Sequence, residues 1–210
     1  MSRNTVVGVD VGGSKKGFHA VAISDNKVTG KLTSSSPTEV GNWCVHMNAR
    51  VVAVDAPSQW SKDGRAREAE RKLMAQKIWC FSTPTKEAAI KHLKNHFGWM
   101  RTGQDLYDQL KPNYYLFDGT WRPHMQFCVE TFPHAIVCAL RGEVTSARNK
   151  GKVRREVLRV AGIDTVELSN IDFVDAALCA VAATCFLKNQ FKSYGSDVDG
   201  YIVVPPCRGL

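Results

Sequence analysis

The sequence predicts an α/β protein built on a mixed β-sheet. Three β-branched segments follow one another at the start of the chain, and helical and strand patterns alternate after them. This order differs from the regular strand-helix-strand alternation of doubly wound nucleotide-binding domains. The chain has 210 residues, no internal repeat and no linker-like segment, so we expect one domain, residues 1–210.

The first three strands are expected at residues 4–13, 17–24 and 26–36. Each segment is apolar or alternates apolar and polar residues, and Gly12 and Gly13 end the first one in a turn. Such short connections favour strands that run antiparallel to one another.

A short helix is expected next, over residues 37–49, because Pro37 is well placed at a helix start and apolar residues recur at helical spacing. The apolar run at residues 50–56 reads as a buried strand that Pro57 ends. Residues 65–79 predict a helix.

The second half alternates in the same way. Residues 86–126 begin as a basic helix and end in an aromatic-rich stretch. The remaining elements are expected as a buried strand at 125–133, a helix at 133–142, a basic helix at 150–162, a helix at 170–188 and a last strand at 200–205.

Positive charge gathers in two segments. The chain has 28 Lys and Arg against 20 Asp and Glu, a net charge of +8. Residues 62–101 hold ten basic and four acidic residues, and residues 141–159 hold seven and two. Clusters of this kind favour a polyanionic partner, nucleic acid first, although solvated helix faces give the same pattern.

Seven scattered cysteines without a C-x-x-C pair predict reduced thiols, mostly in the core, rather than disulfides or a zinc site. No apolar run approaches the length of a membrane span, and Asp10 interrupts the apolar start of the chain. We therefore expect no signal peptide and a cytoplasmic protein.

Five carboxylates share one kind of position. Asp10, Asp55 and Glu130 each close an apolar strand, and Asp172 and Asp175 stand at the start of the helix at 170–188. Acidic residues are uncommon in apolar strands. If the three strands are neighbours, their ends and this helix start bring the carboxylates together.

Such a cluster requires a cation. Two carboxylates 4 Å apart repel by about 4 kcal/mol at an effective dielectric constant of 20. An all-oxygen ligand set suits Mg²⁺ or Mn²⁺, and two such ions can activate water and stabilise the leaving oxygen in phosphodiester cleavage.

Four of these carboxylates also have a local interpretation. Asp10 could bond the glycine turn, Asp172 could cap its helix, and Asp55 could form a turn before Pro57. Glu130 could pair with an arginine such as Arg71. All four local roles holding together is the less economical reading.

Several motifs follow one another between residues 8 and 183: GVDVGGSKKGFHAVAI, VAVDAPSQW, RAREAERKL followed by FSTPT, VETFPHA, and DFVDAALCAVAA. In this order they resemble the family catalogued as domain of unknown function 429, predicted nucleases with an RNase H-like fold.

The resemblance implies a mixed five-stranded sheet flanked by helices, with an acidic metal site for Mg²⁺ or Mn²⁺. Carried over by motif, Asp10, Asp55, Glu130 and Asp175 would be catalytic and, with Asp172, would bind the metal. Lys15, Arg67 and Arg71 lie in the same motifs and would hold phosphates. Residues 86–126 match no family motif, so we expect them to form an insertion.

The leading hypothesis is a metal-dependent nuclease acting on DNA or RNA. One alternative is a phosphotransferase of the sugar-kinase and actin-like group, because the DVGGSKKG run is similar to their first phosphate loop. Another is a non-catalytic nucleic-acid-binding module. The aromatic residues between 97 and 121 predict a secondary core, with base stacking as the alternative.

Overall fold

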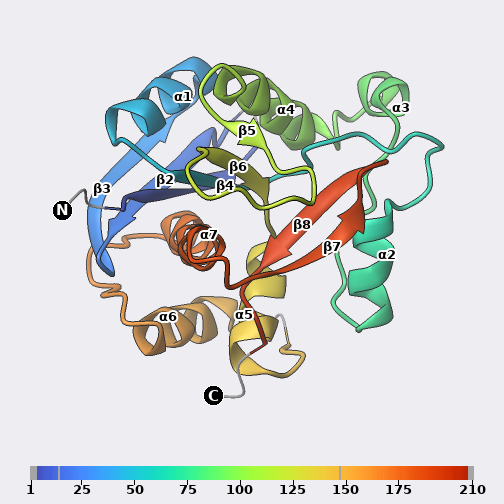
Figure 1. Ribbon diagram of the computed structural model, residues 1–210. Coiled ribbons are helices and arrows are strands. Elements are labelled where there is room, and N and C mark those ends of the chain that lie inside the picture. Colours follow the sequence, from blue (N-terminus) through green and yellow to red (C-terminus); the bar gives the residue numbers. More distant parts are fainter. Residues whose placement is uncertain (1–3, 14, 147, 208–210) are drawn as a thin grey trace.

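A computed structural model describes residues 4–13, 15–146 and 148–207 and confirms the mixed α/β architecture (Figure 1). In these residues eight strands form one sheet in the order β3-β2-β1-β4-β6-β8-β7, with β5 pairing with β6. The strands are β1 (Val6–Val11), β2 (Phe18–Ser24), β3 (Lys27–Ser34), β4 (Val51–Asp55), β5 (Tyr115–Leu116), β6 (Phe127–Glu130), β7 (Lys192–Ser196) and β8 (Gly200–Val204).

The helices in the described residues cover both faces of this sheet. They are α1 (Pro37–His46), α2 (Glu68–Ala75), α3 (Lys86–Lys91), α4 (Gly98–Leu110), α5 (Pro133–Arg141), α6 (Lys150–Val160) and α7 (Ile171–Leu187). In Figure 1, α1 and α4 lie above the sheet and α5, α6 and α7 below it, while α2 lies beside β7 and β8.

The direction of the strands changes across the sheet. β1, β2 and β3 pair antiparallel, as the sequence predicts, whereas β4 pairs parallel with both β1 and β6. β8 is parallel to β6, and β7 pairs antiparallel with β8. The carboxyl ends of β1, β4 and β6 therefore point the same way.

The pleat of each strand separates two apolar cores. In β4, Val51 and Ala53 pack in a core that includes residues of α5, α6 and α7. Val52 and Val54 face the opposite side and pack with residues of α1 and α4. Odd-numbered and even-numbered side chains of β4 thus pack against different helices.

α7 lies in direct contact with β1. A Cβ atom on Gly8 would stand 2.0 Å from the carbonyl oxygen of Ala176 and 2.2 Å from the amide nitrogen of Ala180. Only glycine permits this approach. The side chain of Asn170 caps α7 by accepting a hydrogen bond from the amide of Phe173 at 2.8 Å.

Two strands and one helix were not predicted. β5 has only two residues, and β7 has the polar sequence KSYGS, which lacks apolar alternation and is held in place by β8. α4 begins at Gly98 without a side-chain cap, so the sequence carries no clear helix start there. The sheet is accordingly larger than the five strands implied by the resemblance.

Residues 86–126 contain α3, α4 and β5. α4 buries Leu106, Tyr107 and Leu110 in the same core as α1. Tyr107 therefore packs in one of the main cores of the fold rather than in a separate secondary core. That residues 86–126 form an insertion stays an expectation.

Candidate functional site

Asp10 and Asp55 stand side by side at the carboxyl ends of two parallel strands. They are register partners in the β1–β4 ladder, where adjacent strands lie about 4.8 Å apart. The residues just before them, Val9 and Val54, face α1 and α4. Successive side chains of a strand point to opposite faces of the sheet. The two carboxylates therefore project toward the face that α7 covers.

α7 brings a third carboxylate to this position. Asp175 lies in its second turn and is 7% exposed. Asp172 lies one turn earlier and is not the helix cap, which is Asn170. The structure thus gathers Asp10, Asp55 and Asp175, with Asp172 at the rim.

Two cations of the chain neutralise part of this charge. Arg154 of α6 donates a hydrogen bond to Oδ1 of Asp175, and both side chains are about nine-tenths buried. Lys16, in the turn after β1, lies 3.3 Å from Asp172 but is largely exposed. The buried pair is the stronger of the two, because solvent screens an exposed ion pair.

The remaining negative charge shows in the proton affinities of the three buried carboxylates. Burial, followed by the charges of Asp175 and Asp172, raises the pKa of Asp10 to about 7, against the opposing effect of Lys16 and Arg154. Burial and then the Asp10 and Asp175 charges raise the pKa of Asp55 well above its ordinary value.

Burial also raises the pKa of Asp175, even though Arg154 lowers it. One arginine is therefore not enough to balance three carboxylates, and the cluster favours a proton or a further cation.

The cluster does not form a ready-made metal cage. In residues 4–13, 15–146 and 148–207, no group of three or more His, Cys, Asp or Glu side chains is arranged to hold a metal ion. Asp175 is engaged by Arg154. The donor chemistry, carboxylate oxygens with unbalanced charge, is nevertheless of the kind that suits a hard divalent cation.

Glu130 lies near this cluster but faces the other side of the sheet. Its register partner on β4 is Val54, not Asp55. Its carboxylate accepts hydrogen bonds from the backbone amide and hydroxyl of Ser58, at 2.7 and 2.9 Å, and from Arg67, at 2.5 and 2.9 Å. The structure therefore does not bring Glu130 together with Asp10 and Asp175.

Arg67 is fixed between two carboxylates. It is 1% exposed and also bonds Glu70 at 2.8 Å, and Thr83 donates to Glu70 from its hydroxyl. Burial lowers the pKa of Arg67, but Glu130 and Glu70 outweigh burial and raise it. Glu130 thus pairs with Arg67 rather than with Arg71.

The other two residues expected to hold phosphates are exposed. Lys15 stands in the turn between β1 and β2, one residue before Lys16. Arg71 lies on α2 and donates to the carbonyl oxygen of Ala66. Arg67 has no such access to a substrate, because its guanidinium is buried.

The glycine-rich turn uses its own amides. Gly12 donates to the carbonyl of Gly17 at 2.8 Å, and the amides of Lys16 and Gly17 both donate to the carbonyl of Gly13. Ser14 lies outside the described residues. The Gly12 amide, which a sugar-kinase-like loop would offer to phosphate, is therefore already engaged.

Arg154 and Ser58 are the site residues that the sequence analysis missed. Arg154 counted only toward the basic segment at residues 141–159. Val157 and Leu158, three and four residues later, are buried, so helical spacing places Arg154 on the inner face of α6. That spacing was the available signal.

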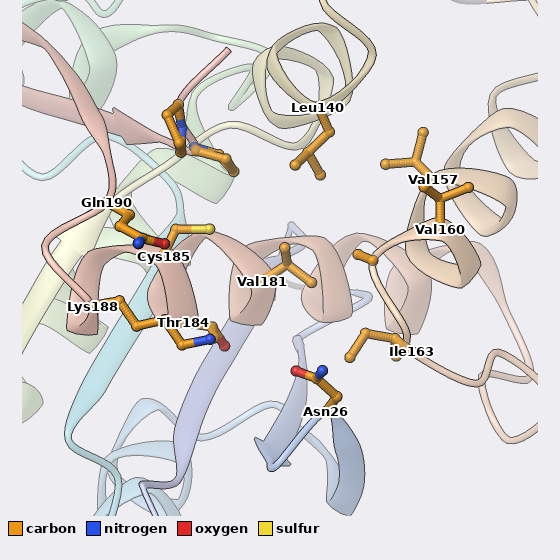
Figure 2. Close-up of a pocket in the computed structure, with 13 residues that line it drawn as sticks. Asn26, Leu140, Val157, Val160, Ile163, Val181, Thr184, Cys185, Lys188 and Gln190 are labelled. Atoms are coloured by element: carbon orange, nitrogen blue, oxygen red, sulfur yellow. The ribbon is translucent and has the colours of Figure 1, made fainter. Parts of the chain in front are cut away.

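Two cavities differ in whether predicted site residues line them. An apolar cavity of about 220 Å³ lies between α5, α6 and α7 and is lined by no carboxylate. Figure 2 shows Leu140, Val157 and Val181 among its lining residues. A small cavity of about 50 Å³ is lined by Asp55 and Glu130. Only the second cavity contains predicted site residues.

No helix in the described residues is long and apolar enough to cross a lipid bilayer. None of the cysteines in the described residues forms a disulfide.

Comparison with known proteins adds one finding. The family model described as protein of unknown function, DUF429, matches residues 8–199. No curated protein and no solved structure matches the chain.

Proposed function

Because the chain belongs to the DUF429 family, whose description leaves the function open, we propose from its own geometry that it is a metal-dependent nuclease. The observation that carries this proposal is the meeting of Asp10, Asp55 and Asp175 on one face of the sheet, with the pKa of each raised.

An RNase H-like fold is part of the proposal. Its support is the run β3-β2-β1-β4-β6, in which three antiparallel strands are followed by parallel ones. On this reading residues 1–210 form a single domain, and the segment 86–126, together with β7 and β8, would be additions to a five-stranded core.

Asp10 and Asp55 would hold Mg²⁺ or Mn²⁺, and Asp175 would join them when Arg154 turns away. Bound there, the cation would activate water and neutralise charge on a scissile phosphate. Glu130 would support the site from the other face, because it fixes Ser58, three residues after Asp55. Asp172 would hold Lys16 at the rim.

Nucleic acid is the proposed partner. The net charge of +8 favours a polyanion, and Lys15 and Arg71 are exposed cations from the motifs that carry the site. Freed from Asp175, Arg154 would itself face the phosphate. Cysteines that form no disulfide in the described residues suit a reducing compartment, so we place the protein in the cytoplasm.

The test is cleavage of end-labelled DNA and RNA oligonucleotides by the purified protein in Mn²⁺, Mg²⁺ or EDTA. We expect cleavage that requires the metal and falls at least about 100-fold in Asp10→Asn and Asp55→Asn. Asp105→Asn, an exposed acid on α4, is the matched control and should cleave normally.

Calorimetric titration with Mn²⁺ separates metal binding from catalysis. Oligonucleotide binding without metal-dependent cleavage would instead identify a binding module and contradict the nuclease proposal. Cleavage that survives both Asp10→Asn and Asp55→Asn would contradict it as well.

A further inference from the structure

The cavity beside Asp55 is walled by aromatic rings as well as acids. Phe81, Trp99 and Phe132 line it together with Asp55 and Glu130. Phe81 lies in the segment between α2 and α3, and Trp99 lies in the first turn of α4. Neither ring belongs to the predicted set of site residues, yet both adjoin one of its acids.

From this cavity a chain of rings extends over the surface. Phe81 contacts Trp99 at 6.1 Å and His96 at 6.0 Å between ring centroids, and His96 contacts Phe97 at 5.0 Å and His92 at 5.7 Å. Phe81 is 62% exposed, and His92 and His96 are exposed too. We call these five residues the ring platform.

The chain segment that carries the ring platform is basic. Residues 77–101 contain five cations and only one acid, Glu87, a net charge of +4. In the part of the chain that the structure describes, none of these cations forms an ion pair, and all are exposed. They are Lys77, Lys86, Lys91, Lys94 and Arg101.

We infer that the ring platform stacks unpaired bases while lysines of the same segment hold the backbone, so that the substrate is single-stranded nucleic acid led past Phe81 to Asp55. Exposed rings interleaved with basic residues are the usual means of binding a single strand. A duplex keeps its base faces stacked inside and could use only the lysines. This inference rests on the proposed function, because it assigns a substrate class to the same site.

The test measures binding apart from cleavage. Fluorescence anisotropy in EDTA compares fluorescein-labelled 12-nucleotide single strands of DNA and RNA with the matching duplexes. We expect the single strands to bind at least about fivefold more tightly than the duplexes, and Phe81→Ala and His96→Ala each to weaken single-strand binding about fivefold or more.

Trp79→Ala is the matched control, because Trp79 is 71% exposed in the same segment but does not line the cavity. It should bind like the wild type. The double variant Lys91→Ala/Lys94→Ala should reduce the salt dependence of single-strand binding, by about 0.7 in log–log slope for each lost phosphate contact.

The two proposals can fail separately. Single-strand binding that depends on Phe81 but is never followed by cleavage in Mn²⁺ would retain the platform and reject the nuclease. The opposite outcome is metal-dependent cleavage by a protein that binds single strands and duplexes equally well, with an affinity that Phe81→Ala leaves unchanged. That outcome would retain the nuclease and reject the platform. If the protein binds neither single strands nor duplexes, the inference about the platform is overturned.

Discussion

Arg154 of α6 donates a hydrogen bond to the carboxylate of Asp175 on α7 at the point where α7 meets the ends of β1 and β4. Its guanidinium is the buried cation that acts on Asp10, Asp55 and Asp175 alike. A divalent ion at this position would take over the same electrostatic role. Arg154 and the metal should therefore compete for Asp175.

Replacing Arg154 tests this competition. Arg154→Met leaves Asp175 buried without its partner, so we expect a loss of about 2–4 kcal/mol in the free energy of unfolding at pH 7.5 in EDTA. Mn²⁺ should stabilise this variant more than it stabilises the wild type. Urea unfolding with and without Mn²⁺ measures both effects, and Arg159→Met, an exposed change on the same helix, is the control. Equal behaviour of the two variants would refute a special role for Arg154.

Asp10 gives the stability a defined dependence on pH. Its pKa is raised from the ordinary value of 3.8 to about 7, so between these values the folded chain binds more protons than the unfolded chain. Stability contributed by Asp10 is therefore lost as the pH rises from about 4 to about 7.

Asp10→Asn removes this dependence. In EDTA at pH 8 we expect Asp10→Asn to be more stable than the wild type by about 1–4 kcal/mol, with the difference vanishing near pH 4. Chemical unfolding at pH 4.5, 6 and 8 measures it, with Asp105→Asn as a control that should show no such trend. A destabilised Asp10→Asn at pH 8 would contradict the raised pKa.

The sequence predicted most of the elements and some of the residues that meet in the candidate site. Apolar runs and prolines located β1, β4 and α1, because these elements carry their own local signals. It also named Asp10, Asp55 and Asp175 as candidates. Asp10 and Asp55 close apolar strands, and Asp175 lies near the start of an apolar helix. Lys192–Ser196 carries no such signal, because an edge strand depends on its neighbour rather than on its own side chains.

Glu130 shows what the sequence could not determine. The position of a residue at the end of a strand does not reveal which face of the sheet its side chain occupies. A shift of one residue in register moves the side chain to the other face. β6 pairs Glu130 with Val54, so its carboxylate meets Arg67 instead of Asp55. Only the register of β4 against β6 reveals that difference.

Arg67 should matter for stability much more than its neighbour Arg71. Arg67→Met leaves Glu130 and Glu70 buried without their shared cation, so we expect a loss of about 3–5 kcal/mol. Arg71→Met, on the exposed side of α2, should change stability by less than about 0.5 kcal/mol. Thermal and urea unfolding of the two variants compare them directly. If Arg67→Met lowered the free energy of unfolding only slightly, the ion pairs with Glu70 and Glu130 would contribute little to stability.

Gly8 controls how closely α7 approaches the sheet, and thereby where Asp175 stands. In Gly8→Ala the new Cβ would lie 2.0 Å from the backbone oxygen of Ala176, which cannot rotate away as a side chain could. We expect a loss of about 3 kcal/mol or more, because the whole helix must shift. Any Gly8→Ala protein that folds should also bind Mn²⁺ more weakly, since the shift separates Asp175 from Asp10.

Gly13→Ala is the matched control, because a Cβ at Gly13 meets no atom within 4 Å. It should leave stability unchanged or raise it by up to about 1 kcal/mol through the stiffer unfolded chain. Urea unfolding gives the stability of both variants, and calorimetric Mn²⁺ titration gives the affinity. If Gly8→Ala were as stable as Gly13→Ala and bound Mn²⁺ equally well, the contact of α7 with β1 would not be what positions Asp175 beside Asp10.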